Sequence, residues 1–380
     1  MLMRFAKLRR GWKLLHRWIG LTLGSVLVLA AFTGSLMTVA QPLDEWVHAD
    51  LFRVNPQVSV VAGFPERRVE VGADGAGVLE RVRRQLASEF GPGASFRLRP
   101  PQQRDDSLWA RVGGTWNGVV YFDPRTAVEL GRRGEHRALV NLLFELHSTL
   151  LMGEAGKAIL AMASLAYLFL LISGLVLWWP KRWRHAWTVK LRGGTTRALF
   201  DLHRVGGSLL GLLIAVSVVS GAYMAWRPLS AAVTALSGVP AMVVPKLLAT
   251  PDTTIVATRA APLDMHVVNA CAALPAGRVA FVQVSASPSQ PVRVRLKLPD
   301  DRHPIGLSSV WLHPVTAQVL VVQRWDQLDP GARAYSVIYP LHIGKLGGTM
   351  HTVAVAILGF ALTGFGVGGI WLWWRRRREK

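Results

Sequence analysis

Residues 18–40 read WIGLTLGSVLVLAAFTGSLMTVA, a run of 23 residues without a charged side chain. As an α-helix this run is about 33 Å long, which is enough to cross a hydrocarbon core of about 30 Å. Residues 158–179, 205–226 and 352–374 form three further uncharged runs of similar length. The composition agrees, because 51% hydrophobic residues against 18% charged residues is too apolar for an ordinary soluble surface. The sequence therefore predicts four transmembrane helices, the first being an anchor rather than a cleaved signal peptide.

The formal net charge is +21, and its distribution along the chain predicts the orientation in the membrane. Residues 1–17, 181–204 and 375–380 hold 18 of the 44 Lys and Arg residues, but only two acidic residues. Because basic loops are retained on the cytoplasmic side, both termini and the loop 180–204 are predicted to be cytoplasmic. Topology thus explains the positive charge, and no nucleic-acid partner is expected.

An internal repeat divides the chain into two halves. Counted from His16 and from His203, glycine recurs 4, 8 and 18 residues later. Counted from His147 and from His342, a glycine follows after 27 residues and a tryptophan after 31. The glycines are Gly20, Gly24, Gly34 and Gly174 in the first half and Gly207, Gly211, Gly221 and Gly369 in the second. Two halves of equal orientation predict a pseudo-twofold axis along the membrane normal.

The segments between the spans are predicted to be α+β domains with antiparallel sheets. Residues 292–298, VRVRLKL, alternate apolar and basic side chains as a half-buried strand does, and residues 80–90 have the apolar spacing of a short amphipathic helix. Arginine-rich patches are interpreted as solvated faces, with attraction of an anionic ligand as the alternative. These patches include Arg81, Arg83, Arg84, Arg97 and Arg99.

The predicted fold class is therefore a membrane bundle of four transmembrane helices, in two pseudo-twofold related halves, with two α+β outer domains. The predicted order is a basic N-terminus (1–17), first span (18–40), first outer domain (41–136), interfacial segment (137–157), second span (158–179), cytoplasmic loop (180–204), third span (205–226), second outer domain (227–333), interfacial segment (334–351), fourth span (352–374) and cytoplasmic tail (375–380).

Paired histidines near the ends of the spans are the candidate ligands of a cofactor. His16 and His203 lie near the cytoplasmic ends of the first and third spans, and His147 and His342 near the outer ends of the second and fourth. Ionisable residues at a span are costly unless they are paired or functional. Two imidazoles suit a bis-histidine haem, whereas zinc needs three or four clustered ligands. The sequence predicts two b-type haems, with His351 as an alternative to His342 for the outer one.

The glycine stripe beside the histidines leaves two interpretations open. At 100° per residue, the glycines at plus 4, plus 8 and plus 18 fall within about 80° of the histidine on the helix surface. They allow either close packing between helices or room for a large flat ligand.

Several short motifs together resemble the PepSY-associated transmembrane family. They are LHRWIG (15–20), YFDPRT (121–126), LHSTLLMGE (146–154), SGLVLWWP (173–180), LHR (202–204) and LHIG (341–344). The resemblance implies PepSY-like periplasmic domains, a bacterial inner membrane and a likeness to ferric-siderophore reductases, in which haem carries electrons across the bilayer. Ala127 and Ala317 depart from the glycine that is usual in the family's turn, so divergent PepSY domains are expected.

The leading hypothesis is a haem protein that reduces periplasmic ferric siderophores or other ferric chelates, so that iron is released for uptake. The sequence has no P-loop motif and a single cysteine, so the electrons are expected from a separate quinol or cytoplasmic reductase. Two alternatives remain open, a PepSY-type peptide-binding or protease-regulating module and a transporter of small solutes or metals.

Overall fold

The computed structural model describes residues 2–54, 77–91, 93–135, 139–180, 183–243, 245, 247, 260–287 and 290–379. The chain divides into two compact units. We call Met1–Gln41, Leu142–Leu229 and Ile338–Lys380 the helical unit, and Pro42–Asn141 and Ser230–Val337 the sheet unit. Parts of the predicted outer domains, residues 55–76 and 248–259, lie outside the described residues, as do Lys181 and Arg182 of the predicted cytoplasmic loop.

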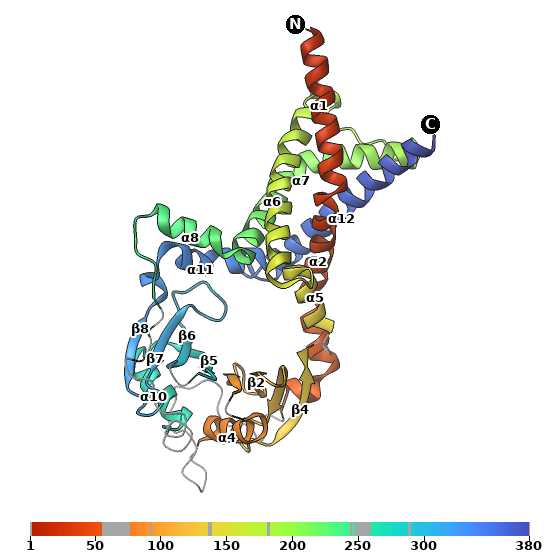
Figure 1. The fold of residues 1–380 in the computed structure, drawn as a ribbon. Helices are drawn as coiled ribbons and strands as arrows, with labels where there is room; N and C mark the ends of the chain where they lie inside the picture. The colour runs from red at the N-terminus through yellow and green to blue at the C-terminus, as the bar shows by residue number, and fades with distance from the viewer. Residues whose placement is uncertain are drawn as a thin grey trace. The chain divides into compact units, whose positions relative to one another are not determined.

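The helical unit is built on four helices that are long and apolar enough to cross a membrane. They are α2 (Leu23–Val47), α6 (Gly153–Trp178), α7 (Thr195–Ala225) and α12 (Gly348–Arg378), and α1 (Leu2–Leu21) precedes α2 with only Thr22 between them. Helix α6 packs against α1 and α7, and α12 packs against α7 and α1 (Figure 1). The four predicted spans are thus helices of one bundle, and the twofold relation of its halves stays a prediction.

Small residues bring the helices of the bundle close together. The hydroxyl of Tyr167 in α6 donates to the carbonyl of Gly211 in α7 at 2.8 Å. A Cβ on Gly211 would lie 2.5 Å from Cδ1 of Leu171, so glycine is what permits this approach. The buried core beside this contact consists of Leu27, Ala163, Tyr167, Ile214 and Ala215. Outward-facing leucines such as Leu212 are exposed, as expected of a surface that contacts lipid.

Short helices flank the long ones, and sharp turns set their ends. Helix α5 (Leu139–Thr149) reverses into α6 through Leu150 and Leu151, which have left-handed φ angles of 52° and 60°. Helix α11 (Pro330–His342) is followed by Gly344, with a φ of 75°. These turns hold the last residues of α5 and α11 against the bundle. The other short helices are η2 (Trp183–His185) and α8 (Arg227–Leu236) in the loops and α3 (Ala49–Phe52) and η3 (Trp325–Gln327) in the sheet unit.

The sheet unit contains one antiparallel sheet of eight strands in the order β4-β3-β2-β1-β5-β6-β7-β8. The strands are β1 (Ser95–Arg99), β2 (Leu108–Gly113), β3 (Gly118–Phe122), β4 (Glu129–Gly134), β5 (Arg278–Val284), β6 (Val292–Lys297), β7 (Ser308–Leu312) and β8 (Val319–Gln323). Strand β1 pairs with β5 through Phe96–Val284 to Leu98–Val282. The sheets of the two predicted α+β domains are therefore joined edge to edge in one continuous sheet, and the division into two domains stays a prediction. Their sheets merge because β1 and β5 would otherwise be edge strands with unpaired backbone groups.

Two helices cover one face of this sheet. Helices α4 (Val78–Phe90) and α10 (Leu263–Ala273) pack with the apolar side chains of that face in one continuous core. In β6 the burial alternates, with Val292, Val294 and Leu296 in the core and the basic residues between them half-buried. The period-two pattern read from the sequence thus identifies the core face of this strand.

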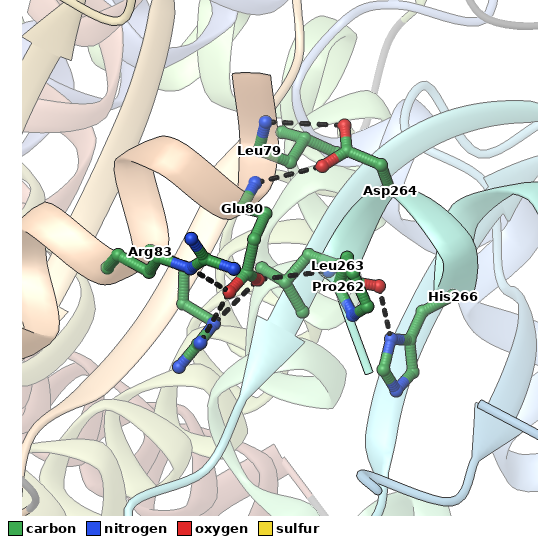
Figure 2. A network of polar contacts seen from close by, with 8 residues as sticks. Leu79, Glu80, Arg83, Pro262, Leu263, Asp264 and His266 are labelled. Atoms are coloured by element: carbon green, nitrogen blue, oxygen red, sulfur yellow. Dashed lines mark hydrogen bonds and ion pairs between the residues drawn. The ribbon is translucent and has the colours of Figure 1, made fainter. Parts of the chain in front are cut away.

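The first turns of α4 and α10 exchange hydrogen bonds (Figure 2). The Asp264 carboxylate accepts from the backbone N–H groups of Leu79 at 3.4 Å and Glu80 at 3.0 Å, and Glu80 accepts from the N–H of Leu263 at 3.1 Å. Each acid therefore satisfies unpaired donors at the start of the other helix. Glu80 is 1% exposed and also binds Arg83 and Arg84, which are thus ion-paired rather than simply solvated.

The two acids of this exchange have opposite pKa shifts. Burial alone raises the pKa of a carboxyl group, and for Asp264 it prevails over the backbone hydrogen bonds, so that its pKa is raised. For Glu80 the hydrogen bond and charge of Arg83 outweigh burial, and its pKa is lowered. The two carboxyl groups of this contact therefore differ in how strongly the protein favours their charged form, and Glu80 is the one that its arginine partners stabilise.

Candidate functional site

The helical unit brings the four predicted histidines together as two pairs. His16 lies in α1 and His203 in α7, and their ring centres are 6.4 Å apart with an interplanar angle of 88°. His147 lies near the end of α5 and His342 is the last residue of α11. Their ring centres are 6.0 Å apart with an angle of 33°. The pairs are therefore the ones that the sequence repeat predicts.

Each imidazole of the His147–His342 pair is fixed by a backbone carbonyl of a long helix. Nδ1 of His147 lies 2.8 Å from the carbonyl oxygen of Ala30, and Nδ1 of His342 lies 3.0 Å from that of Ser217. A carbonyl only accepts, so Nδ1 carries the proton in both rings. His342 also contacts the hydroxyl of Ser220 at 3.1 Å.

The His16–His203 pair is held with one difference. Nδ1 of His203 donates to the carbonyl of Phe365 at 3.0 Å. Nδ1 of His16 instead lies 2.8 Å from the hydroxyl of Ser173, which also lies 3.2 Å from the carbonyl oxygen of Leu170. A hydroxyl can donate or accept, so Ser173 orients the His16 ring without fixing which ring nitrogen carries the proton.

A glycine stands four residues after each of these carbonyls. Ala30 precedes Gly34, and Ser217 precedes Gly221. A Cβ on Gly34 would lie 2.7 Å from Cε1 of His147, and a Cβ on Gly221 would lie 2.7 Å from Cε1 of His342. The missing side chain therefore lets the imidazole reach the helix carbonyl.

The His16–His203 pair has the same arrangement at looser distances. Gly174 follows Leu170 by four residues, and Gly369 follows Phe365. A Cβ on Gly174 would lie 3.4 Å from Cε1 of His16, and one on Gly369 would lie 3.8 Å from Cε1 of His203. Both values are ordinary van der Waals contacts, so these glycines are less constrained.

The glycine stripe therefore serves more than one purpose. Gly34 and Gly221 accommodate an imidazole, and Gly211 permits close helix packing. A Cβ on Gly207 would meet no atom of the described residues within 4 Å. The packing interpretation thus applies to Gly211, whereas Gly34 and Gly221 accommodate histidine rings, and room for a flat ligand stays a prediction.

The three rings that face a carbonyl, His147, His203 and His342, have the tautomer that metal binding needs. With the proton on Nδ1, the lone pair of a neutral imidazole is on Nε2, and such hydrogen bonds orient metal-ligating histidines. Among the described residues, Nε2 of the four paired histidines has no hydrogen-bond partner. Each pair therefore offers two nitrogen ligands.

The spacing within each pair fits two imidazoles on one metal ion. A metal–nitrogen bond of about 2 Å, with the ring centre about 1 Å beyond the nitrogen, gives ring centres about 6 Å apart. The observed distances are 6.4 and 6.0 Å. No group of three or more His, Cys, Asp or Glu residues that could hold a metal occurs in the described part of the chain. Two nitrogens per site fit a metal whose other positions are filled by a macrocycle.

His351 does not take part in the His147–His342 contact. His351 lies in the first turn of α12. A Cβ built on Gly347 would lie 3.1 Å from the Cβ of His351. In the described structure its ring makes no contact with that of His147. Of the two candidates for this position, His342 is the one that faces His147.

Sequence reasoning missed the groups that orient the rings. Ser173, Ser220 and the three backbone carbonyls belong to no recognisable motif. Every residue type has a backbone carbonyl, so the sequence does not mark the ones that accept these hydrogen bonds. The signal that was available is the glycine four residues later, which repeats at equivalent positions of both halves. The glycine pattern predicts close helix packing or room for a flat ligand, and it does not by itself indicate that an imidazole reaches a backbone carbonyl.

The fold and the site define a multi-pass membrane protein with two paired-imidazole sites in a four-helix bundle. The family model of the PepSY-associated TM region matches residues 13–376. The chain therefore belongs to the PepSY-associated transmembrane family, as its motifs indicated. No curated protein matches it.

Proposed function

We propose that this protein binds one b-type haem at each histidine pair and passes electrons across the membrane to ferric chelates. The observation that carries the proposal is the geometry of the pairs, in which four imidazoles lie two by two with ring centres 6.4 and 6.0 Å apart, the spacing of two ligands on one metal ion. Haem bound between two imidazoles supplies one-electron oxidation and reduction at its iron.

The protein's own residues would bind the two haems, orient the ligand rings and exclude water. The Nε2 atoms are the ligands, and the carbonyls of Ala30, Ser217 and Phe365 keep the ring facing each of them in one tautomer and orientation. The surrounding side chains are mostly apolar, Phe365 lying with its ring centre 6.0 Å from that of His203. An apolar shell of this kind excludes water and influences the reduction potential.

The proposed location is the bacterial inner membrane with both termini in the cytoplasm. The basic segments at the termini and between α6 and α7 support this orientation, since Lys and Arg are retained on the cytoplasmic side. His16 and His203 would then hold the haem on the cytoplasmic side, which a quinol or a cytoplasmic reductase can supply with electrons, and His147 and His342 would hold the haem toward the periplasm. The sheet unit would be periplasmic.

The proposed reaction is the reduction of a ferric siderophore or another ferric chelate, which releases ferrous iron for uptake. Membership of the PepSY-associated family and the two histidine pairs support it. The alternatives, a peptide-binding or protease-regulating module and a transporter of small solutes or metals, do not require haem, so haem content separates them from this proposal.

Haem content tests the proposal. The purified full-length protein should show a Soret band and two haems per chain by the pyridine haemochrome assay. His16→Ala or His203→Ala should remove about half of the haem, and so should His147→Ala or His342→Ala. His351→Ala is the matched control and should keep all of it. Protein without a Soret band, or four variants with full haem content, would refute the proposal.

Chelate reduction tests the activity separately. Protein that has been reduced with dithionite and freed of excess reductant should reoxidise when a ferric siderophore is added, with ferrous iron trapped by a ferrous-specific chelator. Reoxidation should stop in variants that lack the His147–His342 pair, whereas variants that lack the His16–His203 pair, being reduced directly by dithionite, should still be reoxidised with about half the electron yield. Haem-loaded protein that transfers no electron to any ferric chelate would leave the haem sites standing and refute the assigned reaction.

A further inference from the structure

A row of basic side chains crosses the sheet unit on the face opposite α4 and α10. Cross-strand pairing places Arg97 of β1 directly opposite Arg111 of β2, and Arg97 is linked through Gln283 of β5 to Arg293 of β6. Consecutive partners in this row are Arg133, Val119, Arg111, Arg97, Gln283, Arg293 and Trp311. Arg295 lies two residues beyond Arg293, on the same face.

The alternation of side chains fixes which face this is. In β1, Phe96 and Leu98 belong to the core beneath the helices, so Arg97 between them points to the other side. In β6, Val294 belongs to that core, so Arg293 and Arg295 on either side of it also point away. We call Arg97, Arg99, Arg111, Arg293 and Arg295 the arginine face.

The charges of the arginine face are only partly balanced by acidic side chains, since Asp106 and Glu45 lie near Arg99 and Asp301 lies near Arg295. Like charges placed directly opposite each other on one face destabilise a sheet. In the described structure, neither Arg97, Arg293 nor Arg295 has a carboxylate oxygen within ion-pair distance. Arg111 has one, Glu135, at 3.4 Å. This face therefore carries a positive potential that an anion would relieve.

Burial and mutual repulsion act on these guanidinium groups. Burial, together with the charge of Arg97, lowers the pKa of Arg293 to about 10. Burial, together with the charge of Arg293, lowers the pKa of Arg295 to about 9. The nearby His303 has a pKa lowered to about 4 by burial and by the charge of Arg295, so it adds no positive charge at neutral pH.

Aromatic rings stand among the arginines. The guanidinium of Arg97 lies 4.9 Å from the ring centre of Phe281, and that of Arg293 lies 4.9 Å from the ring centre of Trp311. Arg99 lies 5.4 Å from the ring of Trp109. Guanidinium groups stacked on rings are held flat, which leaves them ready for planar anionic or aromatic groups.

We propose that the arginine face binds a ferric chelate that is anionic and aromatic, of the tris-catecholate class. Three catecholates around ferric iron leave a net charge of minus three and three aromatic rings, and both properties match this surface. Three hydroxamates around ferric iron give a neutral complex with neither property. The choice of an iron chelate as ligand rests on the proposed function, whereas the charge and aromatic character follow from the arginine face alone.

Binding to the full-length protein in a non-ionic detergent tests the proposal. Isothermal titration calorimetry with a ferric tris-catecholate complex and with a ferric tris-hydroxamate complex should show at least tenfold tighter binding of the catecholate. The triple variant Arg97→Gln/Arg293→Gln/Arg295→Gln should lose at least tenfold in affinity for the catecholate, about 1.4 kcal/mol, and none for the hydroxamate. Each single substitution should weaken binding by a smaller factor, which keeps the test open if the triple variant misfolds.

Arg104→Gln is the matched control. Arg104 is exposed in the loop between β1 and β2, so this change removes one positive charge without altering the arginine face, and binding should be unchanged. Equal affinity of both complexes, or a triple variant that binds the catecholate like the wild type, would overturn the proposal. Displacement of the chelate by phosphatidylglycerol but not by phosphatidylcholine would assign the face to lipid headgroups instead.

The haem content of the same samples separates this inference from the proposed function. Haem-loaded protein that fails to bind the catecholate overturns the inference alone. Protein that binds the catecholate at the arginine face but contains no haem refutes the proposed function and leaves the binding surface standing.

Discussion

The two histidine pairs use the same residue types, but the helices constrain them to different degrees. At His147 and His342 an added Cβ on the facing glycine would lie 2.7 Å from the ring, whereas at His16 and His203 it would lie 3.4 and 3.8 Å away. The first of these pairs is fixed directly by backbone carbonyls, and in the second His16 depends on the side chain of Ser173. The repeated sequence motif thus specifies the same kind of histidine pair twice, but the glycines facing the His147–His342 pair tolerate a larger side chain less well than those facing the His16–His203 pair.

The largest expected difference between the pairs follows from adding one methyl group. Gly34→Ala or Gly221→Ala should displace an imidazole and weaken haem binding at the His147–His342 pair roughly 10- to 100-fold, the usual effect of losing the group that orients a metal ligand. The haemochrome assay should then approach one haem per chain. Alanine in a helix is otherwise neutral or stabilising, so a loss of haem would not reflect a weaker helix.

Three matched substitutions serve as controls for this result. Gly174→Ala and Gly369→Ala at the other pair should keep both haems, and so should Gly207→Ala, where a Cβ meets nothing in the described structure within 4 Å. Equal haem loss from all five variants would mean that the two pairs do not differ in tolerance.

Serine substitutions should affect the pairs in the opposite order. Ser173→Ala removes the hydrogen-bond partner that Nδ1 of His16 has among the described residues, so haem affinity at that pair should fall by about tenfold. Ser220→Ala should change little, because Nδ1 of His342 keeps the carbonyl of Ser217. Haem titration of the haem-free variants measures both. A larger effect from Ser220→Ala would contradict the assigned hydrogen bonds.

The smallest effect on haem is expected from a change in the sheet unit. Glu80→Gln leaves two arginines without their buried partner and should lower the free energy of unfolding of that unit by about 3 kcal/mol, with both haems retained. The pKa of Glu80 is lowered in the folded protein, so its contribution is present above its ordinary value of about 4.3 and is lost as the pH falls through the folded value.

Thermal unfolding of wild type and variant at several pH values measures this contribution. The difference between the two proteins should be constant near neutral pH and shrink in acid. Glu89→Gln, which removes an exposed ion pair with Arg132, should cost at most about 1 kcal/mol. Loss of haem in Glu80→Gln would contradict the expectation that haem binding in the helical unit does not depend on the stability of the sheet unit.

Much of the helical unit could be predicted from the sequence. Uncharged runs of 22 or 23 residues give the four spans, because a bilayer core requires that length. The repeat placed His16 with His203 and His147 with His342, since equivalent residues of two similar halves meet near their common interface. The extension of α2 to Val47 and of α7 back to Thr195 was beyond reach, because hydropathy does not show where a helix continues outside the apolar run.

The sheet unit was less accessible to sequence reasoning. The alternation in residues 292–298 predicted a strand and its core face, but not its neighbours. Cross-strand register depends on partners distant in the chain, so the pairing of β1 with β5 and the row from Arg111 through Arg97 to Arg293 could be recognised only in three dimensions. The exchange between Glu80 and Asp264 was hidden for the same reason.

Electron paramagnetic resonance of the oxidised protein at low temperature tests the central claim most directly, because bis-imidazole ferric haem gives characteristic low-spin signals. The account predicts two such signals, one lost in His16→Ala and His203→Ala and the other lost in His147→Ala and His342→Ala. Absence of a low-spin signal from the wild type, or the same signal surviving in all four variants, would contradict the assignment of these pairs as haem ligands.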